Sequence, residues 1–263
     1  MRLEKAKGDW AVITGASSGI GREFAVQLAA AGMNLILVAR REHLLNILGS
    51  ELTHKYGVRT FVLSIDLSQS NAIAEIKSRM VTEGIKVRLL INNAAFGRWG
   101  CFEATTPETY EEMIRLNVIA MVSLCRHFLQ DLTSFPTSAI INISSPAAFN
   151  PMPYMAVYAA TKAFVYSFSQ ALYGEWKDRG LVVQTLLPGP TETELGIAAG
   201  EYAHVLKKGM KPADVVVKAS LAHLAEGTPV VISARGTYKQ RLFSALFPAK
   251  LVIKTVKRMF QPS

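Results

Sequence analysis

Tyr158 and Lys162 are the two residues whose types and spacing point most directly to chemistry. They are four positions apart in a stretch of helical periodicity, so both side chains project from one face of a helix. A free phenol has a pKa of about 10, and an ammonium group nearby favours the phenolate and should lower that pKa. Tyr–Lys pairs are also common on solvated helix surfaces. We interpret this pair as an acid–base couple that transfers a proton near neutral pH.

Ser145 lies 13 residues before Tyr158, at the end of an expected strand. Side chains at the carboxyl ends of parallel strands face a common crevice, where this hydroxyl can bind an oxygen that gains negative charge. Ser144 should point to the other side of the strand, so we expect a structural or cofactor-adjacent role for it. The alternative is that the two serines form an ordinary turn.

A glycine-rich loop follows the first expected strand, where Thr14 to Gly21 read TGASSGIG before a helix opens. Glycines allow a tight turn and the close approach of a pyrophosphate, while free N–H groups and the helix dipole attract the anion. An ordinary strand-to-helix turn is the alternative, but the strand before the loop and the helix after it favour a dinucleotide. We expect cofactor contacts at Gly15, Ser17, Ser18, Gly19, Ile20 and Gly21.

The second expected strand ends in Ala39, Arg40 and Arg41, where a Rossmann unit that binds NAD usually carries an acidic residue. Two guanidinium groups suit the 2′-phosphate of NADP, which a carboxylate would repel. We assign the phosphate first to Arg40 and second to Arg41, the alternative being that both are solvated. Asp66 follows the third strand and can accept from the adenine amino group or cap the next helix, and the two roles are compatible. The expected cofactor is NADP(H).

Short apolar runs alternate with longer stretches of helical periodicity, a pattern typical of a parallel sheet covered by helices. The expected strands are Trp10–Thr14, Asn34–Val38, Arg59–Leu63, Arg88–Ile91, Ala139–Ile143, Val182–Leu187 and Val230–Ile232. The expected helices are Gly19–Ala31, Glu42–Tyr56, Ser70–Glu83, Pro107–Leu132, Val157–Arg179 and Pro212–Glu226. We predict an α/β fold, a doubly wound parallel seven-stranded Rossmann sheet with helices on both faces. This domain should span residues 1–235, with residues 236–263 as a C-terminal extension.

With these elements in order, the chain resembles the short-chain dehydrogenase/reductase family, in its compact single-domain branch, up to about residue 235. The resemblance rests on motifs in the family's order and approximate spacing: Thr14-Gly15-xxx-Gly19-x-Gly21, Asn92-Asn93-Ala94, Asn117, Ser145, Tyr158-xxx-Lys162 and Pro188-Gly189. It implies a nicotinamide cofactor, reversible oxidation of alcohols to carbonyls and an Asn-Ser-Tyr-Lys tetrad. Ala95 departs from the glycine that commonly follows Asn-Asn-Ala in the family.

The resemblance also implies a role for each member of the tetrad. Tyr158 would protonate the developing alkoxide during reduction and act as the base during oxidation, while Ser145 would polarise the carbonyl. Asn117 would hold a water molecule that links Lys162 to solvent, and Lys162 would also reach the nicotinamide ribose. Further cofactor contacts are expected at Asn92, Ala94, Tyr158, Lys162, Pro188, Gly189, Thr191 and Thr193.

The substrate pocket is expected between three segments, Phe96 to Trp99, Pro146 to Tyr154 and Glu194 to Met210. Adaptable apolar side chains gather in and beside them: Phe149, Met152, Tyr154 and Met155. Such a lining favours a hydrophobic ketone or acyl substrate, although the same residues could serve packing or a subunit interface. Arg98 could bind an anionic carrier group or be solvated.

The amino-acid composition excludes several classes of protein. A chain of 263 residues that is 50% hydrophobic and 19% charged suits one folded α/β domain and excludes a disordered chain. Two cysteines, Cys101 and Cys125, make neither a disulfide framework nor a zinc site, so we expect a reducing, cytoplasmic setting and no metal. The N-terminus lacks the apolar run of a signal peptide, and prolines interrupt the longest uncharged stretch, so we expect neither secretion nor a transmembrane segment.

The formal charge of +9 is concentrated at the C-terminus, because residues 235–263 hold seven basic and no acidic residues. On a helical wheel, one face gathers Lys250, Lys254, Lys257 and Arg258, and the opposite face gathers Val252, Ile253, Val256, Met259 and Phe260. Pro248 separates them from the apolar Leu242, Phe243, Leu246 and Phe247. The segment suits peripheral contact with an anionic membrane, or packing on a partner subunit or over the substrate pocket. Nucleic acid is not expected, since no reading motif accompanies the charge.

These features predict an NADP-dependent oxidoreductase acting on a hydrophobic carbonyl or alcohol substrate. The family resemblance implies a homodimer or homotetramer through the helices Pro107–Leu132 and Val157–Arg179. Two rival functions are a non-catalytic NADP-sensing protein and a peripheral membrane protein that uses the basic tail. The intact tetrad argues against the first rival, and the second can coexist with catalysis.

Overall fold

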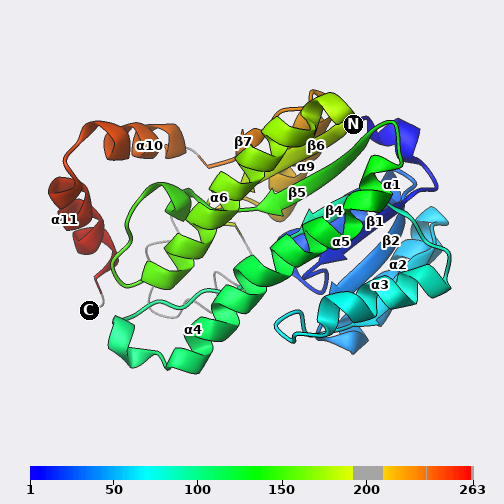
Figure 1. Ribbon diagram of the computed structural model, residues 1–263, viewed down its shortest axis with the longest axis horizontal. Coiled ribbons are helices and arrows are strands. Elements are labelled where there is room, and N and C mark those ends of the chain that lie inside the picture. The colour runs from blue at the N-terminus through cyan, green and yellow to red at the C-terminus, as the bar shows by residue number, and fades with distance from the viewer. Residues whose placement is uncertain (192–209, 235, 262–263) are drawn as a thin grey trace.

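The structure of the protein is a computed structural model that describes residues 1–191, 210–234 and 236–261. A sheet of seven parallel strands runs through its centre in the order β3-β2-β1-β4-β5-β6-β7 (Figure 1). The strands are β1 (Trp10–Thr14), β2 (Asn34–Ala39), β3 (Thr60–Ser64), β4 (Val87–Asn92), β5 (Ser138–Ile143), β6 (Leu181–Leu187) and β7 (Val230–Ile232). Each expected strand is confirmed to within one residue at either end.

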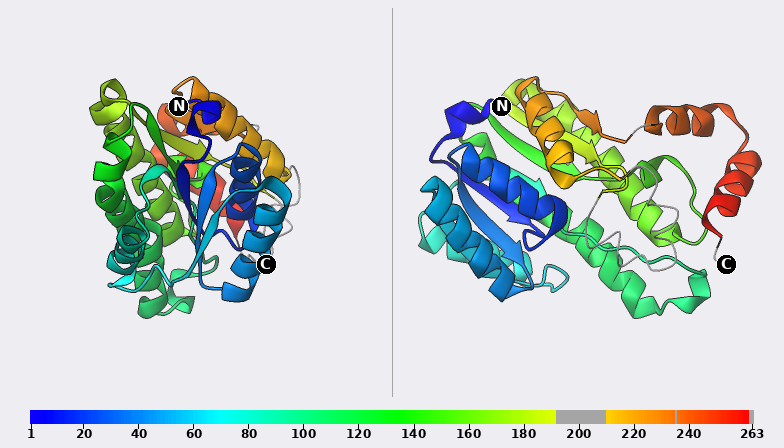
Figure 2. Two further views of the ribbon diagram at one scale, coloured as in Figure 1. Left: turned by 90° about the vertical axis from the view of Figure 1, so that its right-hand side faces the viewer. Right: turned by 180° about the vertical axis from the view of Figure 1, so that it is seen from behind.

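Helices cover both faces of the sheet, as the right-hand view of Figure 2 and Figure 1 show from opposite sides. One face carries α1 (Gly19–Ala30), α2 (Glu42–Tyr56) and α9 (Ala213–Ala225), and the other carries α3 (Ala72–Thr82), α5 (Met121–Thr133) and α6 (Ala156–Trp176). Continuously apolar strands are explained by this arrangement, since a strand covered on both faces buries every side chain. β4 and β5 are accordingly buried along their full length.

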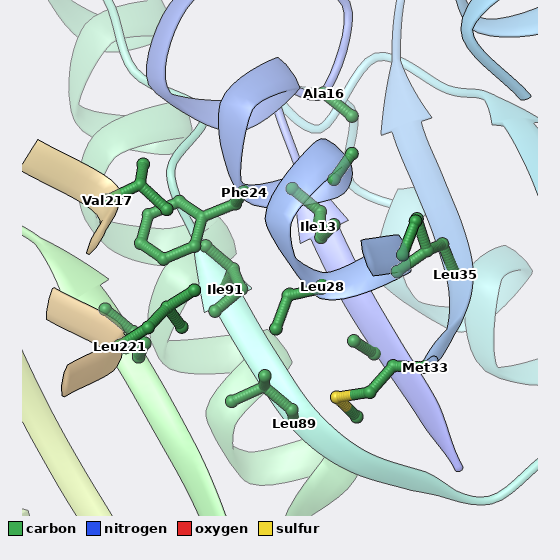
Figure 3. Close-up of a cluster of buried hydrophobic side chains, with 14 of the residues drawn as sticks. Ile13, Ala16, Phe24, Leu28, Met33, Leu35, Leu89, Ile91, Val217 and Leu221 are labelled. Carbon is green, nitrogen blue, oxygen red and sulfur yellow. The ribbon is translucent and has the colours of Figure 1, made fainter. Parts of the chain in front are cut away.

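The core on the α1 face is shown in Figure 3, where Phe24 and Leu28 of α1 point toward the strands. They pack with Ile13 of β1 and with Val217 and Leu221 of α9. This packing joins the N-terminal half of the sheet to a helix almost 200 residues later, so the chain forms one continuous core up to β7. The doubly wound architecture predicted from the alternating pattern is therefore confirmed.

The long helix expected over Pro107–Leu132 is present but interrupted. It consists of α4 (Pro107–Ile114), a π-helical segment η3 (Arg115–Ala120) and α5. Thr106 caps its start by accepting a hydrogen bond from the backbone N–H of Thr109, and Pro107 occupies the first turn. π-helical insertions occur often at functional sites, and this one contains Asn117.

Short 3₁₀ segments complete the domain: η1 (Leu3–Ala6), η2 (Phe102–Ala104), η4 (Pro146–Phe149) and η5 (Lys177–Arg179). The C-terminal extension forms two helices, α10 (Thr237–Leu246) and α11 (Ala249–Phe260), which meet at Pro248. This pair, here called the C-terminal hairpin, lies at one end of the molecule, beyond the start of α6, in Figure 1 and in the right-hand view of Figure 2. Among the described residues, no helix has both the length and the apolar content needed to cross a bilayer.

Candidate active site

Tyr158 and Lys162 lie on the face of α6 that is turned into the protein. Tyr158 is 9% exposed and Lys162 is 4% exposed. The Lys162 Nζ atom lies 5.7 Å from the centre of the Tyr158 ring and donates a 2.9 Å hydrogen bond to the backbone oxygen of Ile143, the last residue of β5. The pair is therefore buried at the carboxyl end of the sheet, which excludes the solvated-surface alternative.

Ser145 is the second residue after β5 and lies close enough to Tyr158 for its side chain to lower the pKa of that phenol. Its own hydroxyl oxygen accepts a 3.2 Å bond from the backbone N–H of Ala147, which holds the side chain at the start of η4. Ser144 points elsewhere, as expected from strand alternation, and donates a 2.8 Å bond to the backbone oxygen of Lys162. Ser144 and Lys162 together tie the end of β5 to α6, and this fixes Ser145 beside Tyr158.

Burial dominates the protonation equilibria of this pair. It raises the pKa of Tyr158 above its usual value, and the hydrogen bond with Ser145 acts in the opposite direction. Burial also lowers the pKa of Lys162 to about 8. We expected Lys162 to lower the pKa of Tyr158. The sign differs because desolvation penalises the charged forms of both groups, and Lys162 itself is driven toward its neutral form.

Asn117 is buried in the π-helical segment and joins the site to the loop after β4. Its side chain accepts from the backbone N–H of Phe96 at 3.1 Å and donates to the Phe96 oxygen at 2.9 Å and to the Thr161 hydroxyl at 3.1 Å. A cavity of about 10 Å³ lies between Asn117 and Lys162, which is space for one water molecule. The position agrees with the water-holding role that the family resemblance implies, and that role remains a prediction.

The glycine-rich loop has the backbone that a phosphate cradle requires. Gly15 and Gly19 have φ angles of +65° and +54°, in the left-handed region that favours glycine. A Cβ on Gly21 would collide with the backbone oxygen of Gly15, so helix α1 and the loop can approach this closely only with glycine there. Ser18 occupies the N-cap position of α1 but makes no side-chain capping hydrogen bond. The first backbone N–H groups of a helix have no intrahelical partner, so those of α1 are available to an anion. The residues present fit a bound dinucleotide.

The two arginines after β2 occupy different positions. Arg41 donates from Nη2 to the hydroxyls of Ser17 and Ser18, both at 2.9 Å, and so lies against the glycine-rich loop. The Arg40 side chain is 70% exposed, and its Nη1 lies 3.8 Å from a carboxylate oxygen of Glu112 on α4. The structure thus brings Arg41, which the sequence placed second, into direct contact with the cradle.

Three other expected cofactor residues are placed as follows. Asp66 accepts at 2.9 Å from the backbone N–H of Ser68 and at 2.8 Å from its hydroxyl, so it caps the turn after β3 rather than helix α3. The buried Asn92 side chain donates to Asn142 at 2.8 Å, away from the loop. Ala94 follows β4 and donates its N–H to the Thr14 hydroxyl at 3.0 Å.

Asn93 is a loop-positioning residue to which the sequence analysis gave no separate role. Its side-chain amide donates to the backbone oxygens of Thr14 at 2.9 Å and Gly15 at 3.3 Å. Its position within the Asn-Asn-Ala motif was the available signal, because adjacent residues at a strand end point in opposite directions. Asn93 therefore ties β4 to the glycine-rich loop, while Asn92 belongs to the buried layer.

The segment after β6 borders the same crevice. Thr191 donates from its hydroxyl to the backbone oxygen of Gly189 at 2.9 Å, and a Cβ on Gly189 would come within 2.6 Å of the Ala234 side chain. Pro188 directly follows β6. Thr193 and most of the expected pocket loop up to Met210 lie outside the described residues.

An apolar cluster surrounds Tyr158 and includes residues of the C-terminal hairpin. Its buried members are Met113, Ala147, Met152, Tyr158, Ala159, Val252 and Val256, and Phe96, Tyr110, Met155, Val157, Phe243 and Phe260 pack against them. We call this set the Tyr158 cluster. Trp99 donates from Nε1 to the backbone oxygen of Phe260 at 3.0 Å, which ties the end of α11 to the loop after β4. The sequence left open whether the C-terminal segment contacts a membrane, a partner subunit or the substrate pocket. In the structure α11 packs on the cluster that contains Tyr158.

Within the residues described, no group of three or more His, Cys, Asp and Glu side chains is arranged to hold a metal ion. Cys101 is exposed and Cys125 is buried, and neither is in a disulfide.

Comparison with known proteins finds one matching family and several similar enzymes. The family described as short chain dehydrogenase matches residues 9–202. The very-long-chain 3-oxoacyl-CoA reductase of Bos taurus is 33% identical over 192 residues, which are 72% of this chain and 61% of that protein. The chain therefore spans about three fifths of the length of that relative.

Two further proteins extend the likeness over more of the chain. The 17-beta-hydroxysteroid dehydrogenase type 3 of Mus musculus is 31% identical over 225 residues, 85% of this chain and 71% of that protein. A solved short-chain dehydrogenase from Sphingobium yanoikuyae, in complex with NADPH, is 33% identical and has a TM-score of 0.80. That superposition covers 92% of this chain and 97% of the other.

Proposed function

The chain belongs to the short-chain dehydrogenase family of oxidoreductases, and from this premise we propose that it is an NADP(H)-dependent enzyme that interconverts a carbonyl and an alcohol on a hydrophobic substrate. The observation that carries the proposal is the buried pair of Tyr158 and Lys162, with the partly buried Ser145 beside Tyr158, at the carboxyl end of the sheet.

The side chains of this group supply the proton chemistry. During reduction, the Tyr158 hydroxyl donates its proton to the substrate oxygen as that oxygen becomes an alkoxide, and Ser145 donates a hydrogen bond to the same oxygen. The nicotinamide, when bound, supplies the hydride to the carbonyl carbon. Burial keeps Tyr158 protonated and therefore able to act as the acid. With a pKa of about 8, Lys162 can exchange a proton near neutral pH, and the water-sized cavity that borders both Asn117 and Lys162 can hold the water that supplies this proton.

Preference for NADP(H) over NAD(H) is assigned to Arg41 and Ser17, with Arg40 as a second cation. Arg41 already hydrogen-bonds to the hydroxyls of the cradle, so its guanidinium is held where a 2′-phosphate can be met by a charge-assisted bond. The strand end carries no carboxylate that would favour an unphosphorylated ribose. The Sphingobium yanoikuyae relative, which was solved with NADPH, supports this choice.

A hydrophobic substrate is favoured by the lining around the acid. Thirteen hydrophobic residues gather in the Tyr158 cluster, and its methionines Met113, Met152 and Met155 can adjust to different shapes. The names of the relatives, an acyl-CoA reductase and a hydroxysteroid dehydrogenase, support substrates with large apolar parts.

We further infer a homo-oligomer and a reducing compartment. Large apolar side chains are exposed on the η3 and α6 surfaces that the family resemblance assigns to assembly, with Ile119 54% and Phe164 42% exposed. Neither cysteine is paired, which suits the cytoplasm.

The test is oxidation of NADPH, with NADH beside it, across a panel of steroid, long-chain acyl-thioester, aliphatic and sugar ketones. Turnover of an apolar ketone should fall at least about 100-fold in Tyr158→Phe, because a positioned acid contributes about 10² to 10⁴ in rate. NADPH should still quench tryptophan fluorescence in that variant. Binding of NADPH without turnover of any ketone by the wild type would instead identify a cofactor-sensing protein.

A further inference from the structure

Helix α10 turns an apolar line toward solvent. Tyr238, Leu242 and Leu246 recur at four-residue intervals and are 66%, 58% and 69% exposed. The opposite side of the helix packs on the protein, where Thr237 is buried and Gln240 donates to the backbone oxygen of Pro146 at 3.4 Å. A surface helix of a soluble protein normally shows the reverse orientation, with its polar face outward.

Exposed cations border this line on both sides. Successive residues are about 100° apart around a helix, which sets Lys239 and Arg241 on the two flanks of the line. On α11 the buried Val252 and Val256 face the Tyr158 cluster, and the exposed Lys250, Lys254, Lys257 and Arg258 lie on the other side. No acidic residue occurs from position 236 to position 263. The hairpin therefore combines exposed apolar side chains with a single sign of charge.

An anionic bilayer can bind both the exposed apolar side chains and the cations. Aromatic and aliphatic side chains of an interfacial helix enter the boundary between headgroups and acyl chains, while flanking Lys and Arg reach the lipid phosphates. A second copy of this chain is a poorer partner, because a two-fold contact would set six hairpin cations against six others. We propose that the C-terminal hairpin docks the protein on an anionic membrane surface through the apolar line of α10 and the cations beside it.

Docking would place the candidate active site next to the bilayer. Phe243 of α10 packs in the same cluster as Tyr158, and Val252 and Val256 of α11 are buried members of that cluster. A hydrophobic substrate dissolved in the membrane would then enter between the hairpin and the loop that Trp99 ties to it. This consequence rests on the proposed function, whereas membrane binding itself does not.

The experiment is flotation of the full-length protein with vesicles of phosphatidylcholine alone and of phosphatidylcholine mixed with phosphatidylglycerol. We expect flotation with the anionic vesicles at low salt and at least tenfold less with neutral ones. About 1 M salt should release the protein, since charges are then screened beyond about 3 Å. Leu242→Glu/Leu246→Glu should reduce binding to the anionic vesicles at least tenfold.

The matched control is Ile47→Glu/Val81→Glu, which adds the same charge at apolar side chains that are 56% and 65% exposed on α2 and α3. It should float like the wild type. A second variant, in which all six hairpin cations are changed to Gln (Lys239, Arg241, Lys250, Lys254, Lys257 and Arg258), should lose the salt-sensitive part of the binding. Circular dichroism melting checks that each variant is folded.

Three results would overturn the proposal: no flotation of the wild type with anionic vesicles, equal flotation of the Leu242→Glu/Leu246→Glu variant and its control, or a halved mass of that variant in light scattering. The last result would assign the hairpin to a second copy of the chain. None of these measurements requires turnover, so their failure is distinct from failure of the proposed reaction.

Discussion

Gly97 lies directly against the ring of Tyr158, so closely that a Cβ on Gly97 would be 2.9 Å from Cδ2 of the tyrosine. Gly97 belongs to the loop after β4 whose backbone Asn117 fixes at Phe96, so the contact joins a held loop to the proposed acid. A side chain at this position would have to displace the Tyr158 ring from its present place beside Ser145. Glycine is thus required at position 97 because there is no room for a Cβ, and no motif in the sequence indicated this.

Gly97→Ala should therefore lower kcat at least about tenfold with little change in NADPH affinity, because displacement of a catalytic group by about 1 Å can cost about 10²-fold. Steady-state kinetics and NADPH titration measure the two quantities. Gly174→Ala is the matched control, since nothing lies within 4 Å of the added Cβ and the site is in α6 itself. The control should retain full activity and gain about 0.5–1 kcal/mol in free energy of unfolding. Equal kcat values for the two variants would contradict the account.

Arg41→Ala should raise the Kd of NADPH about 10- to 100-fold and leave the Kd of NADH almost unchanged, since a charge-assisted bond to phosphate contributes about 1.5–3 kcal/mol. Arg40→Ala is the comparison at the neighbouring, more exposed position and should have the smaller effect. Isothermal titration of the wild type and both variants with each cofactor measures the six Kd values. A wild-type preference for NADH would refute the assignment of both arginines.

Lys162→Met should stabilise the fold at neutral pH while it abolishes activity. Burial lowers the pKa of Lys162 from 10.5 to about 8, which corresponds to roughly 3 kcal/mol against the charged form in the folded state. The variant loses the hydrogen bond to Ile143, so a net gain of about 1–2 kcal/mol is expected at pH 7.

The same shift fixes the sign of a pH dependence. Between pH 8 and pH 10.5 the unfolded wild-type chain binds more protons at Lys162 than the folded chain does, so the free energy of unfolding should rise with pH across this window. The Met variant lacks this contribution. Urea unfolding at each pH measures the free energy of unfolding of the wild type and of the Met variant. The contributions of the other titrating groups cancel in the difference between these two free energies. A difference that does not change with pH would exclude a buried ammonium group at Lys162.

The sheet and most of the site could be predicted from the sequence, because they depend on patterns within short segments of the chain. Each strand is a short apolar run, and Tyr158 and Lys162 are linked by helix geometry alone, so neither depended on distant contacts. The π-helical segment around Asn117 was missed because its composition is that of an ordinary helix. The orientations of Arg40, Arg41 and Asn92 depend on which neighbours their side chains reach, and those neighbours come from other elements.

The position of the C-terminal hairpin was the part that sequence could not decide, since an amphipathic helix indicates a buried face but not what covers it. Trp99 supplies the link in the structure, through its bond to the backbone oxygen of Phe260. Trp99→Phe keeps the ring packing and removes this donor, so amides of α11 should exchange with deuterium about 2- to 10-fold faster, as expected for one hydrogen bond of about 0.5–1.5 kcal/mol. Trp176→Phe, on α6, is the control and should leave exchange in α11 unchanged. Unaltered exchange in Trp99→Phe would mean that apolar packing of Val252 and Val256 alone holds α11 over Tyr158.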